Sequence, residues 1–205
     1  MTADPSSTPE PDGLVRCHDE VYDTFERLEY HDRYWGTPTR NEQRLFEFLS
    51  LSGMQAGLNW WGIWRRREAF RAAFDDFQPS VVAEYGDAKI AELLADEGII
   101  RNRTKINGII NNARAIRDMV PEFANLRDYL WGFLDGTPRL NSWPRNETVP
   151  AVAPPAEELS ADMKKRGFKF CGPTIMYAYI GSVGLVNDHR EGCFKQGEQP
   201  FDISR

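Results

Sequence analysis

The residues best suited to hold a metal ion lie near the two ends of the chain. The sequence has only three cysteines and three histidines, and none of them falls within residues 32–170. His189 and Cys193 are four residues apart, so a helical turn or a tight loop would bring them to one face. With Cys17 and His31 they form a closed tetrahedral zinc set of two thiolates and two imidazoles. Spacing alone leaves open that all four are ordinary buried or surface residues. Four protein ligands would in any case leave no position for a catalytic water.

Aromatic residues crowd two short segments in the first third of the chain. The residues concerned are Tyr30, Trp35, Trp60, Trp61 and Trp64. Aromatic rings stack on flipped or unpaired bases, because every base presents a π-face. Core packing is the commoner use of such side chains, so we expect it to account for most of the five.

A third candidate site is a helical hairpin around residues 96–103. A short helix is expected to end before Gly98, and a second to begin near Lys105. Backbone amides of such a hairpin can hold a DNA phosphate without reading bases. Arg101, Arg103 and Lys105 would supply positive charge. A helical corner with a charged rim has the same pattern, so the motif alone does not decide between the two interpretations.

Helical periodicity dominates the chain and predicts an all-α fold. No segment alternates between polar and apolar residues for long enough to predict a half-buried strand. A proline-rich stretch over 136–155 is expected to be a long loop, which could separate two halves. The expected helices cover 41–56, 60–74, 87–95, 105–119, 122–134, 157–166 and 173–184.

Length and composition suit a globular protein with one sizeable hydrophobic core or two small ones. The chain has 205 residues, of which 41 % are hydrophobic, and a formal net charge of −6. No apolar run approaches the roughly 20 residues that span a bilayer, so no membrane partner is expected. Residues 1–14 lack the basic start and apolar run of a signal peptide. We therefore expect a disordered tail, one domain over 15–205, and a cytoplasmic location. The negative charge argues mildly against non-specific nucleic-acid binding, although clustered basic residues could still form one basic face.

Five blocks of sequence follow the order that is typical of one known family. They are Arg16-Cys17 with 30–36 (YHDRYWG), 55–60 (QAGLNW), 98–106 with 112–114 (GIIRNRTKI and NAR), 164–170 (KKRGFKF) and 184–189 (GLVNDH). Over residues 16–195 the chain thus resembles the bacterial 3-methyladenine DNA glycosylase I family, which belongs to the helix-hairpin-helix DNA glycosylases.

The resemblance implies a helix-hairpin-helix glycosylase fold with a structural zinc that ties the N- and C-terminal segments together. The family's zinc ligands fall on Cys17, His31, His189 and Cys193, whereas His18 and Cys171 fall outside that set. The resemblance also implies a base pocket with an aromatic floor at Trp60. The other pocket positions are Tyr30, Trp35, Gln55 and Leu58. Arg101, Arg103 and Lys105 would grip the DNA backbone.

The implied activity is that of a monofunctional DNA glycosylase of base excision repair. It would hydrolyse the N-glycosidic bond of 3-methyladenine in alkylated double-stranded DNA, and we expect it to act as a monomer. The methylated base is cationic, so it is already a good leaving group. The enzyme therefore has to flip the nucleotide, stack the cation on an indole and stabilise an oxocarbenium-like sugar. No lysine stands where it would suggest Schiff-base lyase chemistry.

The main departure from the family pattern is Ser52. The family usually has a glutamate there, whose carboxylate hydrogen-bonds the adenine edge and complements its charge. A hydroxyl can donate or accept a hydrogen bond but carries no charge. A pocket with Ser52 should therefore bind a cationic base about 1–3 kcal/mol more weakly than a pocket with the family's glutamate. The family also usually has serine at Asn59 and often an aromatic residue at Arg27.

Three functions remain compatible with the sequence because of Ser52. The first is excision of 3-methyladenine, which we place ahead because the aromatic and zinc positions persist. The second is the same fold with altered base specificity, since neutral groups suit an uncharged base edge. The third is a DNA-binding protein without catalysis. A replacement carboxylate could come from Glu29, Asp32 or Glu47, although Glu47 should not point the same way as Ser52 on one helix.

Overall fold

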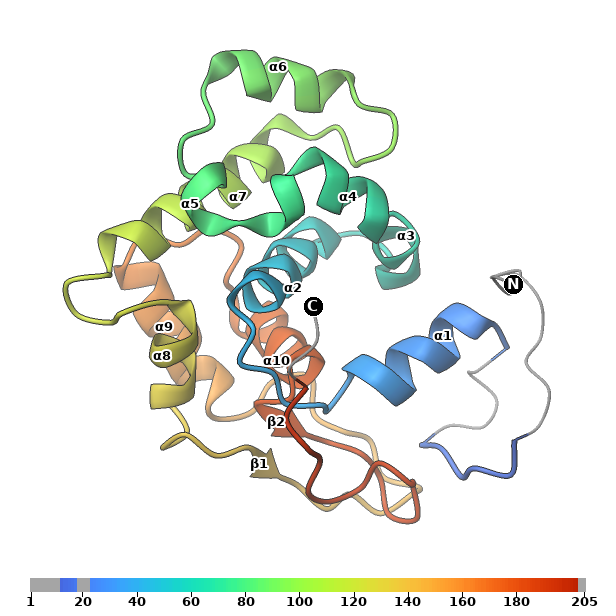
Figure 1. The fold of residues 1–205 in the computed structure, drawn as a ribbon. Coiled ribbons are helices and arrows are strands. Elements are labelled where there is room, and N and C mark those ends of the chain that lie inside the picture. Colours follow the sequence, from blue (N-terminus) through green and yellow to red (C-terminus); the bar gives the residue numbers. More distant parts are fainter. Residues whose placement is uncertain (1–11, 18–22, 203–205) are drawn as a thin grey trace.

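The computed structural model of the chain describes residues 12–17 and 23–202. Nearly all regular secondary structure in its described part is helical, which confirms the all-α prediction (Figure 1). The helices are α1 (Phe25–Glu29), α2 (Glu42–Gln55), α3 (Trp60–Trp64), α4 (Arg67–Ala73), α5 (Pro79–Val82), α6 (Asp87–Ala95), α7 (Arg103–Asp118), α8 (Leu126–Gly132), α9 (Ala156–Lys165) and α10 (Pro173–Ser182). A π-helical turn (Tyr30–Tyr34) follows α1, and a 3-10 turn (Asp75–Phe77) follows α4.

Two short strands are the only ones among the described residues. β1 (Arg139–Leu140) and β2 (Val186–Asn187) pair in parallel, with Arg139 opposite Val186. β1 belongs to the long loop that was predicted over 136–155, so this loop lies along the C-terminal segment. None of the described helices has the length and apolar character that crossing a membrane requires. The predicted tail falls largely on residues 1–11, which lie outside the described part, as does His18.

The central helix is α2, which packs against α3, α7, α8 and α10 (Figure 1). All its residues from Arg44 to Met54 are buried. Each large apolar side chain buried in this way contributes about 1.5–3 kcal/mol to folding. The Glu42 carboxylate also accepts hydrogen bonds from the Leu126 and Arg127 amides at the start of α8. These two bonds hold the first turn of α2 against the start of α8.

Asparagine side chains set the starts of several helices. Asn41, Asn59, Asn102 and Asn125 precede α2, α3, α7 and α8, and each accepts a hydrogen bond from a backbone amide of the first turn. This explains two shifts from the predicted boundaries. α7 begins two residues before Lys105 because Asn102 is its cap, and α8 begins only after Asn125.

The predicted helix over 60–74 is divided in the structure. Its backbone leaves the helical conformation at Arg66, where φ is −96° and ψ is 5°. The Arg66 amide donates to the carbonyl of Ile63, which closes a tight turn between α3 and α4. Two short helices, α1 and α5, were not predicted, because neither is long enough to display an apolar period.

Candidate active site and metal centre

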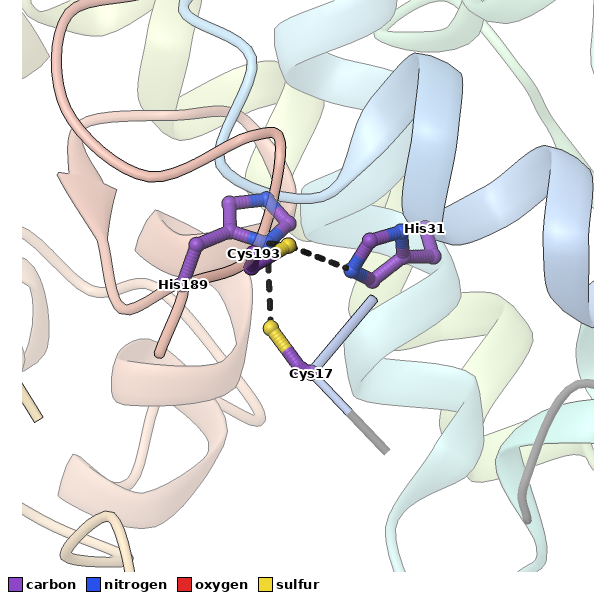
Figure 2. A group of neighbouring side chains, drawn as sticks. All are labelled: Cys17, His31, His189 and Cys193. Atoms are coloured by element: carbon purple, nitrogen blue, oxygen red, sulfur yellow. Dashed lines mark hydrogen bonds between the residues drawn. The ribbon is translucent and has the colours of Figure 1, made fainter. Parts of the chain in front are cut away.

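The structure brings the four predicted zinc ligands together from opposite ends of the chain (Figure 2). All four are buried, and their donor atoms lie within 4.8 Å of one another. Nδ1 of His189 is 3.3 Å from Sγ of Cys17 and 3.5 Å from Sγ of Cys193. Nε2 of His31 is 3.5 Å from Sγ of Cys193. In tetrahedral zinc sites the sulfur and nitrogen donors lie about 3.5 Å apart, so the donor set fits zinc in both chemistry and geometry.

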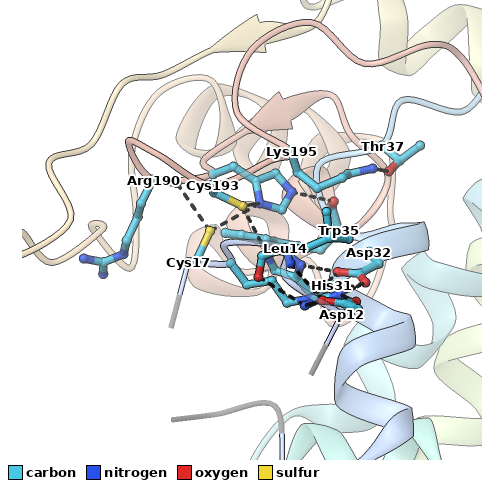
Figure 3. A network of polar contacts seen from close by, with 12 residues as sticks. Asp12, Leu14, Cys17, His31, Asp32, Trp35, Thr37, Arg190, Cys193 and Lys195 are labelled. Atoms are coloured by element: carbon cyan, nitrogen blue, oxygen red, sulfur yellow. Dashed lines mark hydrogen bonds and ion pairs between the residues drawn. The ribbon is translucent and has the colours of Figure 1, made fainter. Parts of the chain in front are cut away.

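The far side of each imidazole is held by the protein (Figure 3). Nδ1 of His31 is 2.7 Å from Oδ1 of Asp32, and Arg16 donates to both oxygens of this carboxylate. Nε2 of His189 lies 2.9 Å from the carbonyl of Trp35. If each histidine donates on that side, Nε2 of His31 and Nδ1 of His189 keep their lone pairs for the metal.

The local electrostatics favour the ligand form at two of the four positions, His189 and Cys193. Burial lowers the pKa of His189, which keeps its imidazole neutral. The hydrogen bond between the two thiols holds the pKa of Cys193 far below its usual range and raises that of Cys17, while burial opposes the first shift and adds to the second. A neutral imidazole and a thiolate are the species that bind zinc.

Gly36, at the end of the YHDRYWG block, is required for this packing. Its φ is +68°, and a Cβ placed on it would lie 2.7 Å from Cδ2 of His189. A side chain there would therefore displace a metal ligand as well as strain the backbone.

We expect Gly36→Ala to lower the free energy of unfolding by about 1–3 kcal/mol through backbone strain alone, and further through weaker zinc binding. Chemical denaturation with parallel zinc quantification measures both effects. Gly132→Ala is the matched control, because this glycine is the last residue of α8 and a Cβ on it would meet no neighbouring element within 4 Å. It should be neutral or stabilising. Equal effects of the two substitutions would contradict the role given to Gly36.

The aromatic residues form a cluster between the π-helical turn and α3. The ring of Tyr30 lies 5.4 Å from Trp60, 5.6 Å from Trp61 and 5.0 Å from Trp64, between ring centroids. Trp64 is fully buried and stacks on Trp60 at 5.8 Å. Trp64 is thus core, but it is the only fully buried member of the five, for most of which we expected core packing. Tyr30, Trp60 and Trp61 are only partly buried, so part of each ring remains accessible.

Trp35 lies beside the metal centre. Its ring is 4.5 Å from that of His189, and a Cβ on Gly181 of α10 would be 3.2 Å from its Nε1. Tyr30 reaches the next residue of α10, with its hydroxyl 2.7 Å from Oγ of Ser182. Because Ser182 donates to the carbonyl of Ala178, it accepts this bond from Tyr30. The end of α10 thus joins the predicted pocket to the metal centre.

Ser52, Gln55 and Leu58 follow one another at the end of α2 and in the loop to α3. Ser52 is buried, with only 2 % of its surface exposed, and Gln55 is the half-buried last residue of the helix. Leu58 is 46 % exposed. The loop ends at Asn59, which caps the helix that begins with Trp60. Three of the predicted pocket residues, Gln55, Leu58 and Trp60, therefore lie on one short segment that begins at the end of α2.

None of the three carboxylates considered as replacements at Ser52 is free. Glu29 pairs with Arg67 at 2.9 Å. Asp32 is held by Arg16 and His31 in the metal centre. Glu47 pairs with Arg71 of α4 at 2.7 Å.

The predicted DNA-backbone residues divide into two kinds. Arg101 and Arg103 are exposed at the hairpin between α6 and α7. Lys105 is half-buried, and its ammonium donates to the carbonyls of Met54 and Ala56 at 2.7 Å each. Its side chain is therefore engaged with the end of α2.

Sequence reasoning missed several residues that build the site. Asp32 could have been found, since a carboxylate beside a candidate histidine ligand is a common second partner of a metal site. Ser182 carries no local signal, because it is separated from Tyr30 by 152 positions. Cys171 is buried but lies outside the metal cluster among the described residues, as the resemblance implied.

Comparisons with known proteins agree with this geometry. The family model described as methyladenine glycosylase matches residues 21–196. The DNA-3-methyladenine glycosylase 1 of Escherichia coli (strain K12) is 40 % identical over 166 residues, which are 81 % of this chain and 89 % of that protein. The DNA-3-methyladenine glycosylase of Haemophilus influenzae is 39 % identical, with 81 % and 90 % covered.

Solved structures give the same result. A crystal structure of 3-methyladenine DNA glycosylase I superposes with a TM-score of 0.83 at 40 % identity, covering 89 % of this chain and 100 % of that one. The Staphylococcus aureus enzyme, whose structure addresses 3-methyladenine recognition, gives 0.82 at 30 % identity, with 88 % and 97 % covered. With a family model over most of its length, relatives of this similarity and a shared fold, the chain belongs to the methyladenine glycosylase family.

Proposed function

We propose that this protein is a monofunctional DNA glycosylase that hydrolyses the N-glycosidic bond of 3-methyladenine in alkylated double-stranded DNA. The observation that carries the proposal is the partly buried pair of Tyr30, in the π-helical turn, and Trp60, which begins α3 just after the end of α2. The helix that follows the exposed basic hairpin is tied to the same end of α2 through Lys105. Relatives named for this activity are about 40 % identical to it over the aligned residues.

Trp60 is the residue best suited to receive the flipped base. It is backed by Trp64, which is fully buried and fixes the indole from behind. An electron-poor methylated base stacks on the electron-rich face of an indole through cation–π attraction, worth about 2 kcal/mol or more once desolvated. Burial raises the pKa of Tyr30, so its hydroxyl stays neutral and keeps its bond to Ser182.

The hydrogen-bonding groups at the end of α2 are neutral. Ser52 and Gln55 can donate to or accept from a base edge, but they bring no charge to a cationic substrate. The positive charge of 3-methyladenine already weakens its glycosidic bond. The pocket therefore has to extrude, stack and orient the base rather than protonate it.

Backbone amides of the hairpin and the exposed side chains of Arg101 and Arg103 would bind phosphates next to the flipped nucleotide. Such contacts fix the position of the protein on DNA without reading sequence. Zinc, held by the two cysteines and two histidines, would tie the N- and C-terminal segments and thereby fix the π-helical turn that carries Tyr30 next to His31. It would play no part in the reaction, because four protein ligands leave it no open position.

The proposal is tested by incubating the purified protein with methylated duplex DNA and separating the released bases by chromatography. Free 3-methyladenine should appear at a rate proportional to enzyme concentration, with abasic sites left uncleaved in the DNA. Strand cleavage without added base or heat would contradict a monofunctional enzyme, and the absence of released base would contradict the glycosylase itself.

A further inference from the structure

The ammonium of Lys105 binds the C-terminal end of α2. Its two partners, Met54 and Ala56, lie 51 and 49 positions earlier in the sequence. Its Nζ is 2.7 Å from the carbonyl oxygen of Met54 and 2.7 Å from that of Ala56. Lys105 itself belongs to the first turn of α7, directly after the hairpin. One side chain therefore joins the predicted DNA-binding hairpin to the segment that enters the predicted base pocket.

The end of α2 needs such a partner. The last carbonyls of a helix have no partner within it, and they form the negative end of the helix dipole. Here the chain turns sharply: the Ala56 amide bonds back to Gly53, and the Leu58 amide bonds to Gln55 at 2.6 Å. Gly57 takes a φ of +73° within this turn. A cation that bridges two carbonyls on either side of Gln55 holds the turn closed.

The turn determines where the pocket residues stand. Gln55 lies between the two carbonyls that Lys105 binds, Leu58 follows at the exposed tip, and Asn59 caps the helix that begins with Trp60. If the turn shifts, Trp60 shifts relative to the hairpin. A displacement of about 1 Å at a reacting group can cost 10²-fold in rate.

We propose that Lys105 is a positioning residue, which holds the pocket segment 55–60 in a fixed relation to the DNA-binding hairpin, and that it makes no phosphate contact. This inference rests on the proposed glycosylase function. Two of the three donors of its ammonium are occupied, and reaching outward would leave the carbonyls of Met54 and Ala56 without this partner. Burial lowers the pKa of Lys105, in keeping with an ammonium drawn from water onto neutral acceptors. Arg101 and Arg103, by contrast, are exposed.

A positioning residue and a phosphate-contacting residue affect the salt dependence of DNA binding differently. Each phosphate contact contributes about 0.9 to the slope of log affinity against log salt on duplex DNA. We would measure this slope on undamaged duplex for the wild type, Lys105→Met and Arg103→Gln. Lys105→Met should leave the slope and the affinity unchanged, whereas Arg103→Gln should reduce the slope by about 0.9.

The rate of base release at saturating DNA is the second measurement. Under single-turnover conditions Lys105→Met should release base about 10- to 100-fold more slowly than the wild type. Lys105→Arg should recover most of the rate, because a guanidinium can also bridge two carbonyls. A Lys105→Met variant with a smaller salt slope and a normal rate at saturation would overturn the proposal.

Amide hydrogen exchange gives a readout that does not depend on activity. In Lys105→Met the amides of residues 56–60 should exchange faster, while those of α8 and α9 keep their wild-type rates. Unchanged exchange over 56–60 would overturn the positioning role even if the protein released no base. Release of 3-methyladenine by the wild type tests the proposed function separately.

Discussion

Cys193→Ala should abolish stoichiometric zinc binding and lower the free energy of unfolding by more than about 4 kcal/mol, the range expected when a metal site is lost. The four ligands are buried and join segments more than 150 residues apart. Without the metal, the remaining thiol and imidazoles would stay buried with poorer partners. Because His31 lies next to Tyr30, the loss should also slow base release. Metal analysis, chemical denaturation and the base-release assay measure the three effects.

Cys171→Ala is the matched control for this substitution. Cys171 is also buried, with 3 % of its surface exposed, yet it is outside the cluster. It should retain one zinc per chain and lose no more stability than a small core cavity costs, about 1 kcal/mol. If both variants kept their zinc, or if both lost stability equally, the assignment of Cys193 as a zinc ligand would be contradicted.

Trp60→Ala should slow the release of 3-methyladenine by about 5- to 150-fold, which corresponds to the 1–3 kcal/mol of base–aromatic stacking. The ring is partly buried and forms one wall of the cluster with Tyr30. Its Nε1 has no hydrogen-bond partner among the described residues, so the substitution breaks no polar contact of this atom. Single-turnover kinetics on methylated duplex would measure the change.

Trp60→Phe provides the control for stability and for stacking. It keeps an aromatic face, so its rate should fall much less than that of Trp60→Ala. Both variants should bind undamaged DNA as the wild type does, because the hairpin is unchanged. Equal rates for the wild type and Trp60→Ala would show that the base stacks elsewhere.

The main helices could be predicted because they follow local rules. α2 and α6 match their predicted spans within one residue, since an apolar period and a clear end coincide there. The short helices α1 and α5 could not be found, because four or five residues show no period. The break at Arg66 also escaped prediction, because no proline or glycine marks it.

The metal centre and the hairpin show what sequence can and cannot supply. Two cysteines and two histidines suggested a zinc site, but only the family resemblance justified joining residues from opposite ends of the chain. The positive charge of Lys105 predicted a contact with the DNA backbone, and that contact stays a prediction. Its bonds to Met54 and Ala56 depend on the packing of α7 against α2, which no local pattern encodes.

The most direct test compares the release of 3-methyladenine from methylated duplex DNA by the wild type and by Ser52→Glu, with thermal unfolding as a check on folding. We expect the wild type to release the base with its neutral pocket. The variant should be less stable, because Ser52 is buried. At subsaturating DNA it should be about 5- to 150-fold faster, since a carboxylate gains roughly 1–3 kcal/mol in binding a cationic base. If a folded Ser52→Glu variant releases 3-methyladenine and the wild type releases none, the natural pocket either accepts another base or is catalytically inactive. If neither releases it, this chain is not a 3-methyladenine glycosylase.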